Sequence, residues 1–182
     1  MFFYILSMAA EILKIIDTRV AVIFPLQTEG STLQGVMEQK SPNPNFPDRE
    51  HWQLLGGPVE IGESDGESEQ ALLAHGVIAE LQRIGISATT EMLEVIGKVA
   101  LGDEETLLFL LRLNEDQSPP VDVNPDRNVA TKFRVIDTVS AETDPDTTEF
   151  EKTLIFLALV IDPQPPSEQL RLFNYNLLSQ VS

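Results

Sequence analysis

The chain has 182 residues, enough for one domain with a sizeable core, and a formal net charge of −17. Phosphate contacts require a concentrated Lys and Arg surface, so we expect no nucleic-acid partner. The absence of cysteine excludes disulfides and thiolate sites, and it fits the cytoplasmic location that we expect.

The N-terminal apolar run is short. It covers Met1 to Leu6, whereas a membrane span needs about 20 apolar residues and a secretory signal needs a basic start and a cleavage site. We therefore expect no membrane partner, and Met8 is a second candidate for the start of the protein. Residues 1–18 are predicted to form an N-terminal extension, with a short helix over Ala9 to Ile16.

The next segments favour β-structure. RVAVIFPL, from Arg19 to Leu26, is typical of a buried strand, and LQGVMEQK, from Leu33 to Lys40, predicts a second one after a hairpin turn. The Pro- and Asn-rich stretch Ser41 to Glu50 is predicted to be a loop. An apolar segment, Trp52 to Leu55, then leads into Gly56 and Gly57.

The second half combines helices and strands. One helix is predicted over Glu67 to Ile84, closed by Gly85, and another over Asp146 to Ile161, capped by a D-x-x-E start. Further strands are predicted over Met92 to Leu101, Thr106 to Leu113 and Lys132 to Ile136. This order indicates an α+β fold, an α/β/α sandwich whose mixed sheet has one long helix on each face.

WQLLGGPVEIGES, from Trp52 to Ser64, is similar to the start of the Nudix box, G-x5-E-x7-R-E-U-x-E-E-x-G-U, in which U is aliphatic. Gly57 and Glu63 satisfy its first part, and Gly85-Ile86 fits its end. The preceding strands and the later TKFRVIDTVSA also resemble the family. The likeness implies a Nudix-like domain over residues 19–161, followed by a C-terminal tail over 162–182.

The middle of the box departs from the family. Between Glu63 and the place where R-E-U should begin lie 14 residues, Ser64 to Val77, instead of seven. Counted back from Gly85, the three family glutamates fall on Ala79, Gln82 and Arg83. Cleavage of a diphosphate with Mg²⁺ needs several converging carboxylates, which on a helix means spacing i, i+3 and i+4. Glu80 has no such neighbour, so we expect it to be solvated or paired with Arg83.

The candidate site residues follow from this comparison. Glu63 and Glu80 are candidate catalytic residues, and the candidate ligand-binding residues are Trp52, Gly56, Gly57 and Glu60. No metal or cofactor is expected, although Glu67, Glu80 and Glu104 are candidate ligands for Mg²⁺ if the protein is a hydrolase. His75 is expected to be exposed, and His51 to be a loop residue at the mouth of the cleft.

Three functions remain open. The first is a Nudix-fold protein without hydrolase chemistry that binds a small nucleotide-like ligand or a protein partner. The second is a Mg²⁺-dependent Nudix-type hydrolase of a nucleoside diphosphate linked to another group, with replacement carboxylates as ligands. The third is an unrelated α+β domain in which the Gly-Gly-Pro-Val-Glu run is a coincidence.

Overall fold

The computed structural model describes residues 14–43, 46–61, 68–101, 104–117, 133–160 and 172–174. Within them a seven-stranded mixed sheet has the order β6-β2-β3-β1-β5-β4-β7. Its strands are β1 (Lys14–Thr28), β2 (Ser31–Asn43), β3 (Phe46–Ile61), β4 (Leu93–Leu101), β5 (Glu104–Arg112), β6 (Phe133–Asp137) and β7 (Leu172–Asn174). The helices are α1 (Glu69–Arg83), α2 (Thr138–Thr143) and α3 (Glu149–Val160), with a short 3-10 turn η1 (Thr90–Met92).

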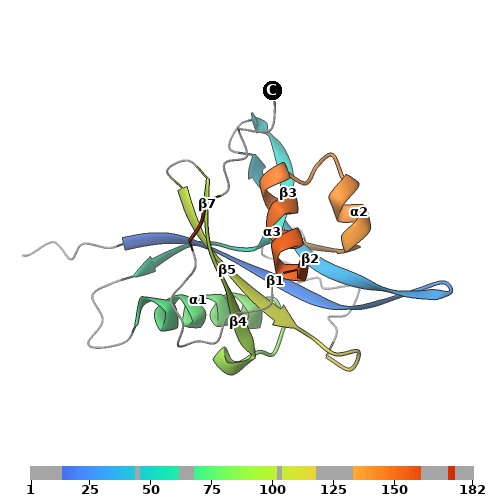
Figure 1. Ribbon diagram of the computed structural model, residues 1–182, viewed down its shortest axis with the longest axis horizontal. Helices are drawn as coiled ribbons and strands as arrows, with labels where there is room; N and C mark the ends of the chain where they lie inside the picture. The colour runs from blue at the N-terminus through green and yellow to red at the C-terminus, as the bar shows by residue number, and fades with distance from the viewer. Residues whose placement is uncertain are drawn as a thin grey trace, which may run out of the picture.

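Strand β1 divides the core into two layers because its side chains alternate between the faces of the sheet. Val20 and Val22 belong to the cluster that contains the apolar face of α1. Ala21 and Ile23 belong to the cluster that contains α3. Figure 1 shows α1 on one side of the sheet and α2 with α3 on the other. The predicted α+β sandwich with a mixed sheet and one long helix on each face is therefore confirmed.

Helix α1 begins two residues after the predicted Glu67 and ends one residue before the predicted Ile84. Ser68 caps its first turn by accepting a hydrogen bond from the backbone N–H of Ala71 at 3.2 Å. Gly85 follows its end with a φ of 87°, a conformation that favours glycine. Helix α3 begins at Glu149 and is capped by Thr148, whose Oγ1 accepts from the N–H of Glu151, rather than by the predicted Asp146.

Two local predictions are wrong because strand pairing overrides the local pattern. Residues 14–16 of the predicted N-terminal helix lie in β1, where Lys14 pairs with Ile61; the rest of that helix lies outside the described residues. The predicted loop over Ser41 to Glu50 is largely strand, because β2 and β3 continue their antiparallel pairing as far as Asn43 and Phe46 across an irregularity after Pro42.

The structure includes one helix and one strand that the sequence did not predict. Helix α2 follows β6 directly and has Asp137 as its N-cap. Strand β7, within the predicted C-terminal tail, pairs with β4 in parallel. The division into extension, domain and tail stays a prediction. In the part of the chain that the structure describes, no helix is long and apolar enough to cross a membrane.

Candidate functional site

The Gly56-Gly57 pair lies inside β3, where this strand packs closely on β1. Gly56 has a φ of 130°, and a Cβ there would lie 2.3 Å from the carbonyl oxygen of Thr18, so only glycine fits. The carbonyl of Gly57 accepts from the Thr18 hydroxyl at 3.0 Å, and that of Gly56 accepts from the Gln39 side chain at 2.6 Å. Close packing of the strands therefore accounts for Gly56, whereas the predicted ligand role of the pair stays a prediction.

Helix α1 carries the positions to which the sequence resemblance assigns the family glutamates, Ala79, Gln82 and Arg83, with Glu80 beside them. Glu80 is held by Arg83, whose Nε and Nη2 donate to the two carboxylate oxygens at 2.9 and 2.6 Å. The structure thus confirms the second of the two states expected for Glu80, pairing with Arg83. Ala79 and Gln82 are exposed beside this pair, and His75 is exposed as predicted. The predicted apolar face is buried: Leu73, Ala74, Val77, Ile78, Leu81 and Ile84.

The other candidate carboxylates are not brought to Glu80 in the described residues. Glu63 and Glu67 lie outside these residues, as does the side chain of Glu104 at the start of β5. Glu60 is exposed on β3, opposite Ile15 of β1. Among the residues that the structure describes, no group of three or more His, Asp or Glu side chains is placed to hold a metal ion.

Trp52 belongs to a polar cluster on the α3 face of the sheet. Its ring lies 4.4 Å from the Arg134 guanidinium and 5.4 Å from the Lys40 ammonium, and its backbone N–H donates to the carbonyl of Asp146 at 2.9 Å. Arg134 forms an ion pair with the buried Glu38 at 2.6 Å. Burial raises the pKa of Glu38, against the opposing effect of Arg134. The predicted ligand role of Trp52 remains a prediction beside this packing role.

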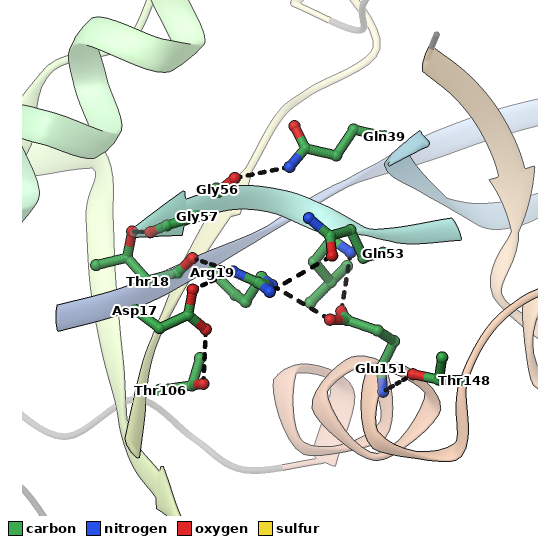
Figure 2. Close-up of polar contacts among 11 residues, drawn as sticks. Asp17, Thr18, Arg19, Gln39, Gln53, Gly56, Gly57, Thr106, Thr148 and Glu151 are labelled. Atoms are coloured by element: carbon green, nitrogen blue, oxygen red, sulfur yellow. Dashed lines mark hydrogen bonds and ion pairs between the residues drawn. The ribbon is translucent and has the colours of Figure 1, made fainter. Parts of the chain in front are cut away.

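A second polar cluster, missing from the sequence-based candidates, joins β1, β3, β5 and α3 (Figure 2). Glu151 of α3 is almost fully buried, and its two oxygens accept from Arg19 Nε at 3.2 Å and from the Leu54 N–H at 2.9 Å. Arg19 also donates to Asp17 at 2.6 Å, and Asp17 accepts from the Thr106 hydroxyl at 2.8 Å. Both oxygens of the buried Glu151 carboxylate are therefore engaged in hydrogen bonds that hold the fold together.

The strand geometry explains why Glu151 reaches this place. Pairing between β1 and β3 ends at Val20 and Leu55, so the N–H of Leu54 has no partner on β1 and takes the carboxylate of α3 instead. Burial raises the pKa of Glu151, and the two carboxylates beside Arg19 raise the pKa of its guanidinium despite burial. Glu151 and Arg19 thus form one buried ion pair that ties α3 to the sheet.

His51 differs from its prediction as a loop residue at the mouth of a cleft. It lies in β3 opposite Ser41, and its side chain is buried. Its Nδ1 has no hydrogen-bond partner, and burial, with a smaller effect of the Arg19 charge, lowers its pKa. The continuation of the β2–β3 pairing through the predicted loop is the reason for this burial.

No family model and no curated protein matches the chain. Solved structures do. NrtR from Shewanella oneidensis, complexed with a 27mer DNA, has a TM-score of 0.53 and 14% identity, over 79% of this chain and 59% of that one. A mutT/nudix family protein from Listeria innocua has a TM-score of 0.52 and 13% identity, over 80% of this chain and 90% of that one. The fold is Nudix-like.

A third similar structure comes from the complex between the C-terminal domain of mouse MUTYH and human PCNA. It has a TM-score of 0.53 and 15% identity, over 84% of this chain and 94% of that one. The present chain thus spans nearly the whole of two of these structures, but less than two thirds of the NrtR chain. At this identity the likeness shows the fold and leaves activity open.

The comparison corrects one prediction. The acidity of the chain led us to exclude nucleic acid as a partner, and that exclusion is wrong, because the Nudix-like fold occurs in NrtR bound to DNA. Net charge summed over a whole chain does not describe the local surface that contacts a phosphate, and a fold can add a binding surface that composition does not reveal.

Proposed function

We propose that this protein is a Nudix-like binding module without hydrolase chemistry. The observation that carries the proposal is the state of Glu80. Its two oxygens are both engaged by Arg83, at 2.6 and 2.9 Å, on the helix face where the family resemblance would put metal ligands. A guanidinium at this place supplies the positive charge that Mg²⁺ would otherwise supply, so it competes with the ion rather than helping it.

The surrounding side chains support the same proposal. Ala79 and Gln82 occupy exposed positions one residue before and two after Glu80, and neither offers a carboxylate. A Mg²⁺ ion needs several oxygen ligands in near-octahedral geometry, and catalysis of diphosphate cleavage needs the ion to be held in place. Glu80, the one carboxylate at these positions, is already paired with Arg83, so the helix offers too few oxygen ligands to hold a Mg²⁺ ion.

The fold neighbours are compatible with a binding role. One of them is a chain from a complex that contains the C-terminal domain of mouse MUTYH and human PCNA, and another is NrtR with DNA. Those assemblies are properties of those proteins. For the present chain they support the proposal only in that a Nudix-like fold is found in macromolecular complexes.

Calorimetric titration with MgCl2, followed by turnover assays on a panel of nucleoside diphosphate derivatives, tests the proposal. We expect weak or no Mg²⁺ binding and no turnover above the buffer blank. The variant Glu80→Gln removes the carboxylate, and Glu91→Gln, an exposed glutamate in η1, serves as a matched control. Robust Mg²⁺-dependent turnover that Glu80→Gln abolishes and Glu91→Gln preserves would overturn the proposal in favour of a hydrolase with replacement ligands.

A further inference from the structure

The exposed apolar side chains of the described residues are concentrated on one part of the molecule. Four of the five large ones lie on α2 and α3: Val139, Phe156, Leu159 and Val160. Phe156 is 58% exposed and Val160 59% exposed. They follow one another at i and i+4, so they form a stripe on the outer side of α3. Exposed apolar side chains that gather on one face are more typical of a contact surface than singly scattered ones.

A hollow lies between α2 and α3, beside this stripe. Its volume is about 320 Å³, and it is lined by Thr138, Glu142, Glu149, Lys152, Thr153, Ile155, Phe156 and Leu159. This volume is at the lower end of ligand pockets, so it accommodates an anchoring side chain or two rather than a large cofactor. Ile155, Phe156 and Leu159 make its apolar part, and the side chains of α2 form the opposite wall.

The charges around the hollow favour a basic partner. Glu142 is exposed on α2, and the side chain of Glu149 is 82% exposed at the start of α3. Lys152 does not offset both, because it already pairs with Glu149 at 2.8 Å. In a symmetric dimer through this face, Glu142 and Glu149 of one copy would approach the same two acids of the other copy, so self-association here is electrostatically disfavoured. A segment with Lys or Arg next to an apolar residue matches both the charge and the hollow.

We propose that the hollow between α2 and α3 docks a basic peptide segment of a protein partner. An apolar anchor of the peptide packs on Phe156 and Leu159, and its Lys or Arg side chains lie beside Glu142 and Glu149. This inference rests on the proposed binding function and names its partner class. It differs from the face of α1, where hydrolase chemistry would reside, because α1 and α3 lie on opposite faces of the sheet.

Selection of a phage-displayed library of short random peptides on the full chain tests the docking proposal. We expect enriched peptides to combine a bulky apolar residue with neighbouring Lys or Arg. One enriched peptide, made with a fluorophore, is then titrated by anisotropy against the variants. Phe156→Ala should raise its Kd at least about tenfold, as loss of an aromatic anchor does. Ile15→Ala, at an equally exposed apolar residue on β1, is the matched control and should change Kd by less than about twofold.

A second pair of matched variants tests the contribution of the acidic residues to peptide binding. Glu142→Lys with Glu149→Lys should raise Kd about fivefold or more at low salt, and the effect should shrink at high salt. Glu29→Lys with Glu91→Lys makes the same change in net charge at exposed residues away from the hollow, and it should have a much smaller effect. Thr153→Arg, which fills the hollow with a cation, provides a loss-of-binding variant independent of Phe156.

Several results would overturn the proposal. These are the absence of any enriched peptide, enrichment of neutral or acidic peptides, or binding that Phe156→Ala and Thr153→Arg leave intact in variants with unchanged melting temperature. Sedimentation that shows a dimer dissociated by Phe156→Ala would assign the surface to a second copy instead. The turnover assay on nucleoside diphosphates is a separate experiment. The docking proposal and the proposal that hydrolase chemistry is absent can therefore each be refuted without the other.

Discussion

Rebuilding a carboxylate cluster on α1 tests whether this helix has the register of a Nudix metal site. The triple variant Ala79→Glu, Gln82→Glu and Arg83→Glu places three acids beside Glu80. All three positions are exposed, so no core packing is lost. The variant also removes the Arg83 guanidinium, which frees both oxygens of Glu80.

The energetic cost without metal follows from the same contacts. Loss of the exposed Glu80–Arg83 pair costs about 0.5 kcal/mol. The new acids create like-charge pairs at i, i+3 and i, i+4, each unfavourable by about 0.2–0.5 kcal/mol. The free energy of unfolding should therefore fall by about 1–2 kcal/mol in total. For a domain of this size, that corresponds to a decrease in Tm of about 2–8 °C.

Magnesium should reverse this loss in the variant. At a free concentration of a hundred times Kd, binding to the folded state adds about 2.7 kcal/mol, or about 5–10 °C in Tm. Thermal unfolding with MgCl2, against NaCl of equal ionic strength, measures this response. The control variant Ser87→Glu, Arg112→Glu and Gln117→Glu has the same charge change at exposed, separated positions, and it should show little Mg²⁺-specific effect. An equally large Mg²⁺ response in the parent and the triple variant would refute the argument that the parent lacks a site, and an equally absent response would refute the register.

Three further predictions concern the buried polar groups and the glycines. Glu151→Ala should lower the free energy of unfolding in urea by about 2–5 kcal/mol, because it leaves the buried Arg19 Nε–H and Leu54 N–H without their acceptor, while Asp17 still pairs with Arg19; a loss below about 1 kcal/mol would contradict this. Burial raises the pKa of Glu38 in the folded state, so its contribution to stability is present at low pH and lost as pH rises through that pKa; Glu38→Gln should flatten the gain in stability that the parent shows as pH falls from neutral toward the ordinary pKa of a glutamate, and an unchanged slope would count against it. Gly56→Ala should cost at least about 2 kcal/mol more than Gly57→Ala, since both have positive φ but only the Cβ at 56 meets a carbonyl, at 2.3 Å; equal losses in urea unfolding would show that strain alone matters.

The parts of the fold that the sequence predicted are those encoded locally. The apolar period of α1 and its closing Gly85 lie within one stretch of chain, and the predicted helix matches the observed one within two residues at its start. The Glu80–Arg83 pair was predictable for the same reason, because i, i+3 residues meet on any helix.

The parts that the sequence missed depend on contacts between distant residues. The glutamate at 151 and the arginine at 19 are separated by 132 residues, so nothing local indicates that they pair. A signal was nevertheless present. Glu151 lies on the buried stripe of α3 with Leu154, Ile155 and Ala158, and a charge in an apolar stripe requires a partner of opposite sign. Arg19, at the start of the apolar strand, was a candidate for that partner.

The same distant contacts explain why α3 is suited to present a docking surface. Its N-terminal half is fixed to the sheet by the Glu151 carboxylate, and the segment just before it is held by the hydrogen bond from Trp52 to Asp146 and the bridge between Trp52 and Thr147. These bonds all lie on the side of α3 that faces the strands, so they leave the outer stripe around Phe156 free. A binding surface is most effective when its side chains stand on a rigid element, because little conformational entropy is then lost on docking. The buried ion pair of Glu151 with Arg19 therefore holds the outer stripe of α3 in place before a partner binds. A variant that weakens this ion pair should reduce peptide affinity in the anisotropy titration, although it changes no residue that lines the hollow.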